Sequence, residues 1–242
     1  MDFIEKNPPA ISFPPLLREK AEQALGDGKR VRPWFMERVC RFLDLDFAPL
    51  VDAAEGIEWI HTASLLHDDV VDDDSTRRGK PSYHSLYGRA EAVLFGDYFF
   101  LHALRIFQAE KYRRSVFPLL LNTVHDMTEG QIAEAQGTVS TEEGYWSYST
   151  SKTARLFELC AQIPLTYYGK SSPPALMLAQ KYGLAFQVAD DLSEEDLGKD
   201  PLNIQHFMSR TDAVEKFRSL CGEMKALRVI PVEELPFIPF EE

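Results

Sequence analysis

The sequence has 242 residues, of which 45% are hydrophobic and 26% charged, the balance of a globular protein with its own core rather than of a disordered or fibrous chain. Its formal net charge of -12 argues against a general nucleic-acid binder, because binding by counterion release needs a basic surface. Any site for phosphate groups must therefore be local.

The chain gives no sign of export or of membrane insertion. Residues 1–14 contain prolines and acidic residues but no apolar secretory segment, and no run approaches the roughly 18 apolar residues that a membrane span needs. The three cysteines, Cys40, Cys160 and Cys221, lie far apart and form no metal-binding pair, which argues against a disulfide framework or a structural zinc. We therefore expect a cytoplasmic protein without a membrane span.

Apolar residues recur at helical spacing through most of the chain, whereas alternating strand-like runs are absent. The sequence therefore predicts an all-α fold, and we expect a single domain over residues 1–242. Breaks are expected where turn residues cluster, at Asp27-Gly28, in the polar run 72–82 and between Gly169 and Pro174. To within a few residues, the expected helices cover 15–25, 32–43, 48–73, 86–109, 113–137, 142–168, 173–193 and 209–224.

The segment from His61 to Lys80 is the most informative one. Asp68 and Asp72 lie four residues apart, so both carboxylates project from one face of the expected helix. Like charges at the carboxyl end of a helix repel each other and oppose the helix dipole unless a cation lies between them. Magnesium suits this position, because it binds one or two carboxylates together with substrate phosphates. A solvated acidic helix end has the same pattern, and this segment alone does not decide between them.

A second acidic pair, Asp190 and Glu194, repeats this spacing at the end of another apolar helix. Two such clusters can hold several magnesium ions around one diphosphate. The second pair therefore favours metal binding over a solvated surface.

Basic residues supply the other half of a diphosphate site. Lys29 and Arg32 lie at the expected start of a helix, where free backbone N–H groups also favour anions, and Arg77 and Arg78 follow the first acidic cluster. Taken singly, such pairs are more often surface charge, and His61 alone is equally compatible with an ordinary core or surface role. Lys152, in the middle of an expected helix, is ambiguous between an extended surface side chain and a functional one.

Taken together, these motifs resemble the trans-isoprenyl diphosphate synthase family of farnesyl, geranylgeranyl and longer polyprenyl synthases. The resemblance covers about residues 28–191 and is closest to the medium-chain and long-chain members. It implies an isoprenoid-synthase helical bundle with a central active-site cavity. Its markers in chain order are Gly28, Lys29, Arg32 and Pro33, the first aspartate-rich motif with Arg77-Arg78-Gly79, Gly96-Asp97, Glu129-Gly130-Gln131, Lys152-Thr153, and Phe186-Gln187 with Asp190-Asp191.

The resemblance implies a prenyltransferase that condenses isopentenyl diphosphate with an allylic diphosphate, head to tail, as a homodimer or within a hetero-oligomer. It implies three magnesium ions per active site, two on Asp68 and Asp72 and a third on Asp190 and Glu194, with Asp69 and Asp191 in support. The diphosphate of isopentenyl diphosphate is assigned to Lys29, Arg32, His61 and Arg78. The allylic diphosphate is assigned to Arg77, Lys152, Gln187 and Lys199, and Thr153 is placed close to the developing allylic cation.

Product length is expected to depend on the helix that precedes Asp68, along which the growing tail would run. Ala63 and Ser64 are small, whereas bulky aromatic residues at these places close the tunnel early in the family. We therefore expect products longer than farnesyl. Trp59 and Ile60, one helical turn further from Asp68, are expected to close the end of the tunnel. The same residues are also compatible with an ordinary helix core that says nothing about product.

The chain departs from the family pattern after Asp190. Glu194 replaces the usual aspartate, the downstream Gly-Lys-x-Thr-x-Pro segment is not recognisable beyond Gly198-Lys199, and the part from about residue 203 is shortened and atypical. Asp27 also replaces a usual glycine. These departures leave open a non-catalytic partner subunit or diphosphate-binding relative. A terpene cyclase is disfavoured, because a cyclase binds one diphosphate and has no need of an isopentenyl site.

Overall fold

A computed structural model of the chain describes residues 15–26, 28–77, 79–194, 197, 201–231 and 234–235. About three quarters of these residues are helical, and the one sheet among them is an antiparallel hairpin of β1 (Thr76–Arg77) and β2 (Lys80–Pro81). The prediction of an all-α fold is confirmed. No helix in this described part is long and apolar enough to cross a membrane.

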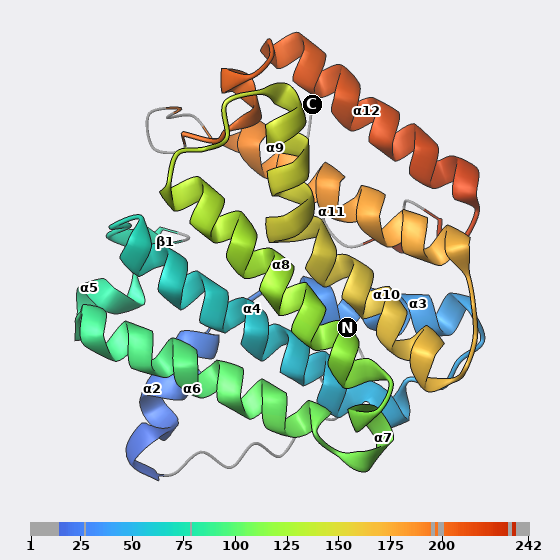
Figure 1. Cartoon of the computed structure of the whole chain (residues 1–242), viewed down its shortest axis with the longest axis horizontal. Coiled ribbons are helices and arrows are strands. Elements are labelled where there is room, and N and C mark those ends of the chain that lie inside the picture. Colours follow the sequence, from blue (N-terminus) through green and yellow to red (C-terminus); the bar gives the residue numbers. More distant parts are fainter. Residues whose placement is uncertain are drawn as a thin grey trace. The chain divides into compact units, whose positions relative to one another are not determined.

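Several helices start where a hydroxyl side chain caps them. The hydroxyl oxygens of Thr141, Ser172 and Ser209 each accept a hydrogen bond from a backbone N–H three residues further on. In chain order, the helices are α2 (Pro15–Leu25), α3 (Val31–Phe42), the 3-10 helix η1 (Ala48–Leu50), α4 (Val51–Val71), α5 (Tyr83–Tyr87), α6 (Arg89–Phe107), α7 (Glu110–Arg113), α8 (Val116–Ala135), α9 (Glu142–Ser149), the π-helix η2 (Thr150–Ala154), α10 (Arg155–Tyr167), α11 (Pro173–Ser193), the 3-10 helix η3 (Ile204–His206) and α12 (Arg210–Leu227) (Figure 1).

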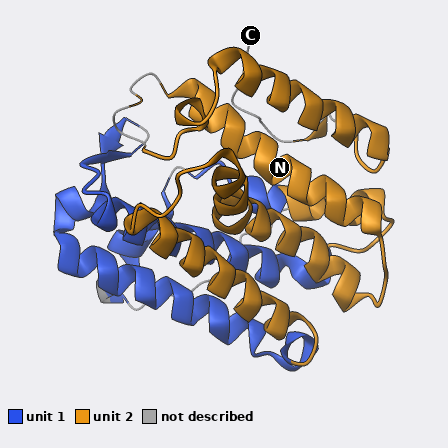
Figure 2. Cartoon of the chain, turned by 45° about the horizontal axis from the view of Figure 1, so that its top comes forward, with its two compact units in different colours: residues 1–34, 48–113 blue, residues 35–47, 114–242 orange. Residues whose placement is uncertain are grey.

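The chain divides into two compact units, of which the first contains residues 1–34 and 48–113 (Figure 2). Its centre is the pair α4 and α6, which pack against each other. Gly56 allows a close approach, since a Cβ there would lie 2.8 Å from a ring carbon of Phe107. Trp59 of α4 and Phe99 of α6 are buried with their ring centroids 6.0 Å apart. This packing holds α4, whose carboxyl end carries the first acidic motif.

The second unit contains residues 35–47 and 114–242 (Figure 2). The rings of Phe35, Phe157 and Tyr182 form a buried cluster with centroid separations of 4.9 to 5.7 Å. A second apolar cluster surrounds the end of α11 and consists of Tyr145, Val188, Leu192, Ile204 and Ala213. The described segment 204–227 therefore packs onto the rest of this unit through η3 and α12.

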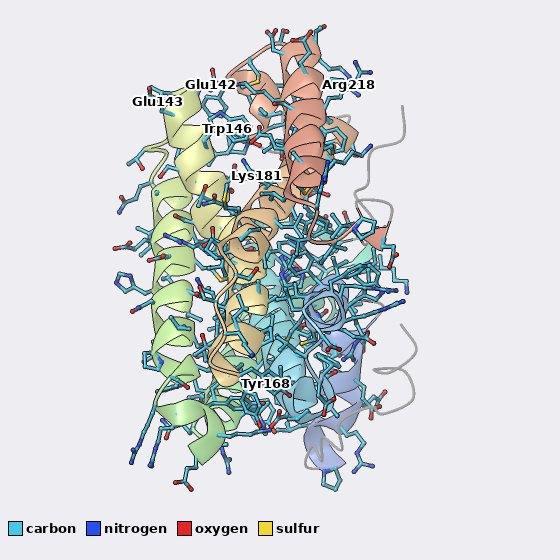
Figure 3. All side chains as sticks on the ribbon, turned by 90° about the vertical axis from the view of Figure 1, so that its right-hand side faces the viewer. Glu142, Glu143, Trp146, Tyr168, Lys181 and Arg218 are labelled. Atoms are coloured by element: carbon cyan, nitrogen blue, oxygen red, sulfur yellow. The ribbon has the colours of Figure 1, made fainter. Side chains whose placement is uncertain are left out.

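Ion pairs add to this packing. Lys181 of α11 pairs with Glu223 of α12, and Lys216 of α12 lies 3.8 Å from Glu142 of α9. Figure 3 shows Trp146 and Lys181 on the side of the second unit where α12 packs. The number of domains stays a prediction.

Three helix boundaries differ from the sequence expectations. The expected helix 86–109 is divided into α5 and α6, because Gly88 between them has a φ of 88°, which a continuous helix does not allow. The helix expected over 113–137 is preceded by the separate short helix α7. The helix expected over 142–168 is continuous, but its five central residues are π-helical.

Candidate active site

The first aspartate-rich motif lies at the carboxyl end of α4, in the first unit. The backbone N–H of Asp72 donates to the carbonyl of Asp68 at 2.8 Å, so the helical register extends through Asp72. Asp73 then takes a left-handed φ of 58° and ends the helix. Asp68 is half-buried and Asp72 is exposed. The two carboxylates therefore lie at accessible places, in the spacing that the sequence predicts.

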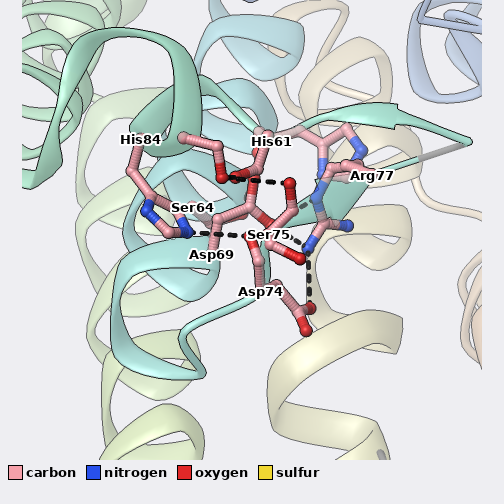
Figure 4. A network of polar contacts seen from close by, with 9 residues as sticks. His61, Ser64, Asp69, Asp74, Ser75, Arg77 and His84 are labelled. Atoms are coloured by element: carbon pink, nitrogen blue, oxygen red, sulfur yellow. Dashed lines mark hydrogen bonds and ion pairs between the residues drawn. The ribbon is translucent and has the colours of Figure 1, made fainter.

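The aspartate between them has a different environment. Asp69 is 2% exposed, and its Oδ1 accepts a hydrogen bond of 2.5 Å from Nε of Arg77 in β1 (Figure 4). Burial by itself lowers the pKa of Arg77, but the carboxylates of Asp69, Asp68 and Asp74 raise it, and the net shift is upward. The guanidinium therefore remains charged beside the acidic motif, held by Asp69.

The loop after α4 is fastened to α5 and α6. His84 Nε2 lies 2.7 Å from the carbonyl oxygen of Asp74 (Figure 4). The Ser85 hydroxyl donates to the carbonyl of Ser75 at 3.0 Å, and Arg89 pairs with Asp73. These contacts fix the hairpin that carries Arg77.

Gly96 of the Gly96-Asp97 marker has a packing role. A Cβ at Gly96 would lie 2.2 Å from Nε2 of His67, the residue just before Asp68. His67 Nε2 also lies 3.2 Å from the carbonyl oxygen of Val93 and 3.6 Å from Asp97. Because Gly96 has no side chain, α6 contacts the turn of α4 that carries the motif.

The basic segment leads into α3 in the first unit, and Arg32 lies in the first turn of that helix. Lys29 is exposed, His61 is half-buried, and Arg32 is buried. Arg30, which sequence reasoning did not single out, forms an ion pair with the buried Glu55 of α4. Burial lowers the pKa of Arg30, and the charge of Glu58 opposes that shift. Arg30 therefore ties the basic segment to α4.

In the second unit, Lys152 lies in the π-helix η2. Its Nζ donates to Oε2 of Glu134 in α8 at 2.5 Å, and the Tyr148 hydroxyl donates to the other oxygen of Glu134 at 2.7 Å. Gly130 lies where α8 meets η2, since a Cβ there would be 3.2 Å from the Ser151 side chain. Such one-turn π segments are frequent at functional sites. Glu134 was not predicted, since nothing local marks it as a partner of Lys152.

The neighbouring Thr153 begins a chain of hydrogen bonds. Its hydroxyl donates to Oε1 of Gln187 at 2.6 Å, and Nε2 of Gln187 donates to Oδ1 of Asp191 at 2.7 Å. The other carboxylate oxygen of Asp191 accepts from the Tyr145 hydroxyl at 2.7 Å and from the backbone N–H of Ile204 at 2.8 Å. The structure thus brings two predicted site residues, Thr153 and Gln187, into direct contact.

The second acidic pair is accessible but is only partly helical. Asp190 and Glu194 are both exposed, whereas Asp191 between them is 2% exposed. α11 ends at Ser193, so Asp190 lies in its last turn and Glu194 is its C-cap residue, with a φ of -77° and a ψ of 122°. The role of this pair as metal ligands stays a prediction.

The residues predicted to set product length lie on α4. Ala63 is fully buried, Trp59 is buried, and Ser64 is half-buried with its hydroxyl donating to the carbonyl of His61 at 2.8 Å. The Trp59 ring lies 5.0 Å from His102 of α6, centroid to centroid. Their role in product length stays a prediction.

Three predicted or noted residues, Arg78, Lys199 and Asp27, lie outside the described residues. Among the described ones, a further group of possible metal ligands was missed: His125, Asp126 and Glu129 on α8, whose ligand atoms lie within 4.8 Å of one another. Asp126 is paired with Arg155 at 3.0 Å, which competes with metal binding.

The helical fold and its two aspartate-rich helix ends define a protein of the isoprenoid-synthase class. A solved geranyltransferase from Legionella pneumophila matches the structure with a TM-score of 0.80 and 25% identity, over 93% of this chain and 84% of that one. A family model for polyprenyl synthetases matches residues 14–206. The chain belongs to this family, as the sequence resemblance predicted, and the family is generally metal-dependent.

Curated relatives agree with this assignment. The octaprenyl diphosphate synthase of Escherichia coli is 36% identical over 186 residues, which are 72% of this chain and 57% of that protein. The chloroplastic solanesyl-diphosphate synthase 2 of rice is 36% identical over 204 residues, 76% of this chain and 50% of that protein. The chain therefore spans about half the length of the curated relatives it matches.

Proposed function

We propose that the protein is a magnesium-dependent trans-prenyl diphosphate synthase that condenses isopentenyl diphosphate with an allylic diphosphate. The observation that carries the proposal is one arrangement of burial and hydrogen bonding that both aspartate-rich motifs have. In each, the second aspartate is buried and hydrogen-bonded while the flanking carboxylates are accessible. If these helix ends were only solvated surface, there would be no physical reason to bury and hydrogen-bond the second aspartate while the carboxylates beside it stay accessible.

Magnesium fits the donor set, because accessible carboxylate oxygens are hard ligands of the kind it prefers. We assign it to Asp68, Asp72, Asp190 and Glu194. When bound, it supplies positive charge that favours the departure of diphosphate.

The chain's own residues bind and orient the substrates. Lys29, Arg32, His61 and Arg78 are proposed for isopentenyl diphosphate, and Arg77, Lys152, Gln187 and Lys199 for the allylic diphosphate. Carbon–oxygen cleavage places positive charge on the allylic fragment, and the Thr153 hydroxyl is proposed to lie beside it. The isopentenyl double bond then attacks, and the resulting cation loses a proton, most simply to the released diphosphate.

We propose products longer than farnesyl, because Ala63 and Ser64 are small and because relatives at 36% identity are named for octaprenyl and solanesyl products. A homodimer in the cytoplasm is the arrangement that we propose for the enzyme. A non-catalytic partner subunit is the second candidate, and it is favoured by the change at Glu194 and by the short span relative to the relatives.

The test is incubation of purified protein with magnesium, labelled isopentenyl diphosphate and allylic primers of increasing length, followed by product chromatography. Elongation beyond farnesyl is expected. No elongation with any primer would refute the synthase and favour the partner subunit.

Product length has its own test. Ala63→Phe is expected to shorten the product, and Ser64→Phe, at a less buried place, serves if the first variant does not fold. An unchanged product from folded variants would refute the placement of the growing tail along α4.

A further inference from the structure

We propose that Asp191 and Gln187 act together to fix the direction of the Thr153 hydroxyl, so that its oxygen lone pairs, and not its hydrogen, are presented to the allylic cation. The inference rests on the proposed function and deepens it. It makes Asp191 a positioning residue in addition to its place in the aspartate-rich motif.

The Asp191 side chain lies at one end of this chain of hydrogen bonds. Three donors point at it, namely the Gln187 amide nitrogen, the Tyr145 hydroxyl and the Ile204 backbone N–H, at 2.7, 2.7 and 2.8 Å. A backbone N–H can only donate, so the Ile204 contact fixes Asp191 Oδ2 as an acceptor. The Gln187 side chain turns its nitrogen toward Asp191 Oδ1 and its oxygen toward Thr153.

This orientation decides what Gln187 offers at its other end. With its nitrogen on Asp191, its Oε1 faces Thr153, and an amide oxygen can only accept. The Thr153 hydroxyl therefore donates to it, as the 2.6 Å contact records. Its hydrogen is thereby occupied, and the lone pairs of the same oxygen remain for another group.

Positive charge is stabilised by lone pairs and opposed by a hydroxyl hydrogen directed at it. Thr153 is buried, at 8% exposed, so water does not readily reorient its hydroxyl. The polarity of the whole chain is thus set by the carboxylate, which lies two hydrogen bonds away from Thr153.

Asp191→Asn reverses this polarity. The introduced amide keeps its oxygen for the Ile204 N–H and turns its nitrogen to Gln187, which must rotate and donate to Thr153, so that the hydroxyl hydrogen turns outward. We expect kcat to fall by about 100-fold, the scale of losing one preorganised polar contact, with KM for both substrates within about twofold. Tyr145→Phe removes one donor without reversing Gln187 and should keep kcat within about threefold of wild type.

A double-mutant cycle with Thr153→Val decides whether Asp191 acts through Thr153. Asp191→Asn should have no further effect in the Thr153→Val background, at unchanged magnesium dependence. Additive losses, or a loss confined to magnesium affinity, would overturn the inference. If Asp191→Asn does not fold, Gln187→Met replaces it in the same cycle. An inactive wild type would refute the proposed function and this inference together, whereas an active wild type with additive losses would refute the inference alone.

Discussion

Gly183→Ala tests whether the close contact between α11 and the π-helix η2 stabilises the second unit against unfolding. A Cβ at Gly183 would lie 2.5 Å from Cα and 2.9 Å from Cβ of Ala154. Carbon contacts are ordinarily about 3.5–4.0 Å, so the two backbones would have to separate by about 1 Å. Overpacking of this kind costs about 1–3 kcal/mol, and the higher helix propensity of alanine offsets about 1 kcal/mol of it.

We therefore expect the free energy of unfolding to fall by up to about 2 kcal/mol, measured by urea denaturation at fixed protein concentration. Gly222→Ala is the matched control, since Gly222 lies inside α12 and a Cβ there meets nothing within 4 Å. It should stabilise by up to about 1 kcal/mol through helix propensity. If the two variants were equally stable, the contact would not constrain α11, and the account of η2 given above would be wrong.

Two further variants test the charges of the site. Glu134→Gln keeps one oxygen that can accept from Lys152, and its amide nitrogen can donate to the Tyr148 oxygen, but it removes the negative charge that would compete with the diphosphate proposed to bind Lys152. KM for the allylic substrate should therefore fall by a few-fold, or about 1 kcal/mol at most. A rise in KM in steady-state kinetics would refute this. Glu194→Asp restores the usual family residue at an exposed, extended position, so the magnesium concentration for half-maximal activity should change by less than about tenfold, or 1.4 kcal/mol; a larger change in a magnesium titration would show that the length of Glu194 matters.

Helices with strong local signals were predictable from the sequence. The bounds of α2 and α11 match the expected 15–25 and 173–193, and α11 starts where Ser172 caps it and two prolines follow. The π-helix was not predictable, because five residues differ too little from α-helical periodicity to leave a pattern. Gly130 and Gly183 allow close packing against it, but both lie far from it in sequence and contact it only in the folded unit.

The candidate site divides in the same way. Spacing alone identified Asp68 and Asp72 as a pair, because four residues make one helical turn. It could not identify the partners of Asp69 and Asp191. The carboxylate of Asp191 is held by Tyr145, 46 positions earlier, and by the backbone of Ile204, 13 positions later. These partners become apparent only in the folded structure, because they are buried and distant in sequence from the aspartates that they bind.

In both motifs the second aspartate is buried and hydrogen-bonded, but its partners differ. Asp69 is neutralised by a guanidinium, a charge that is itself retained because burial and the neighbouring carboxylates oppose each other. Asp191 accepts instead from three neutral donors, namely the Gln187 amide, the Tyr145 hydroxyl and the Ile204 backbone N–H. The second motif thus reaches Thr153 through Gln187, which is why, under the proposed function, the polarity of that hydrogen-bond chain should affect the rate more than the identity of residue 194.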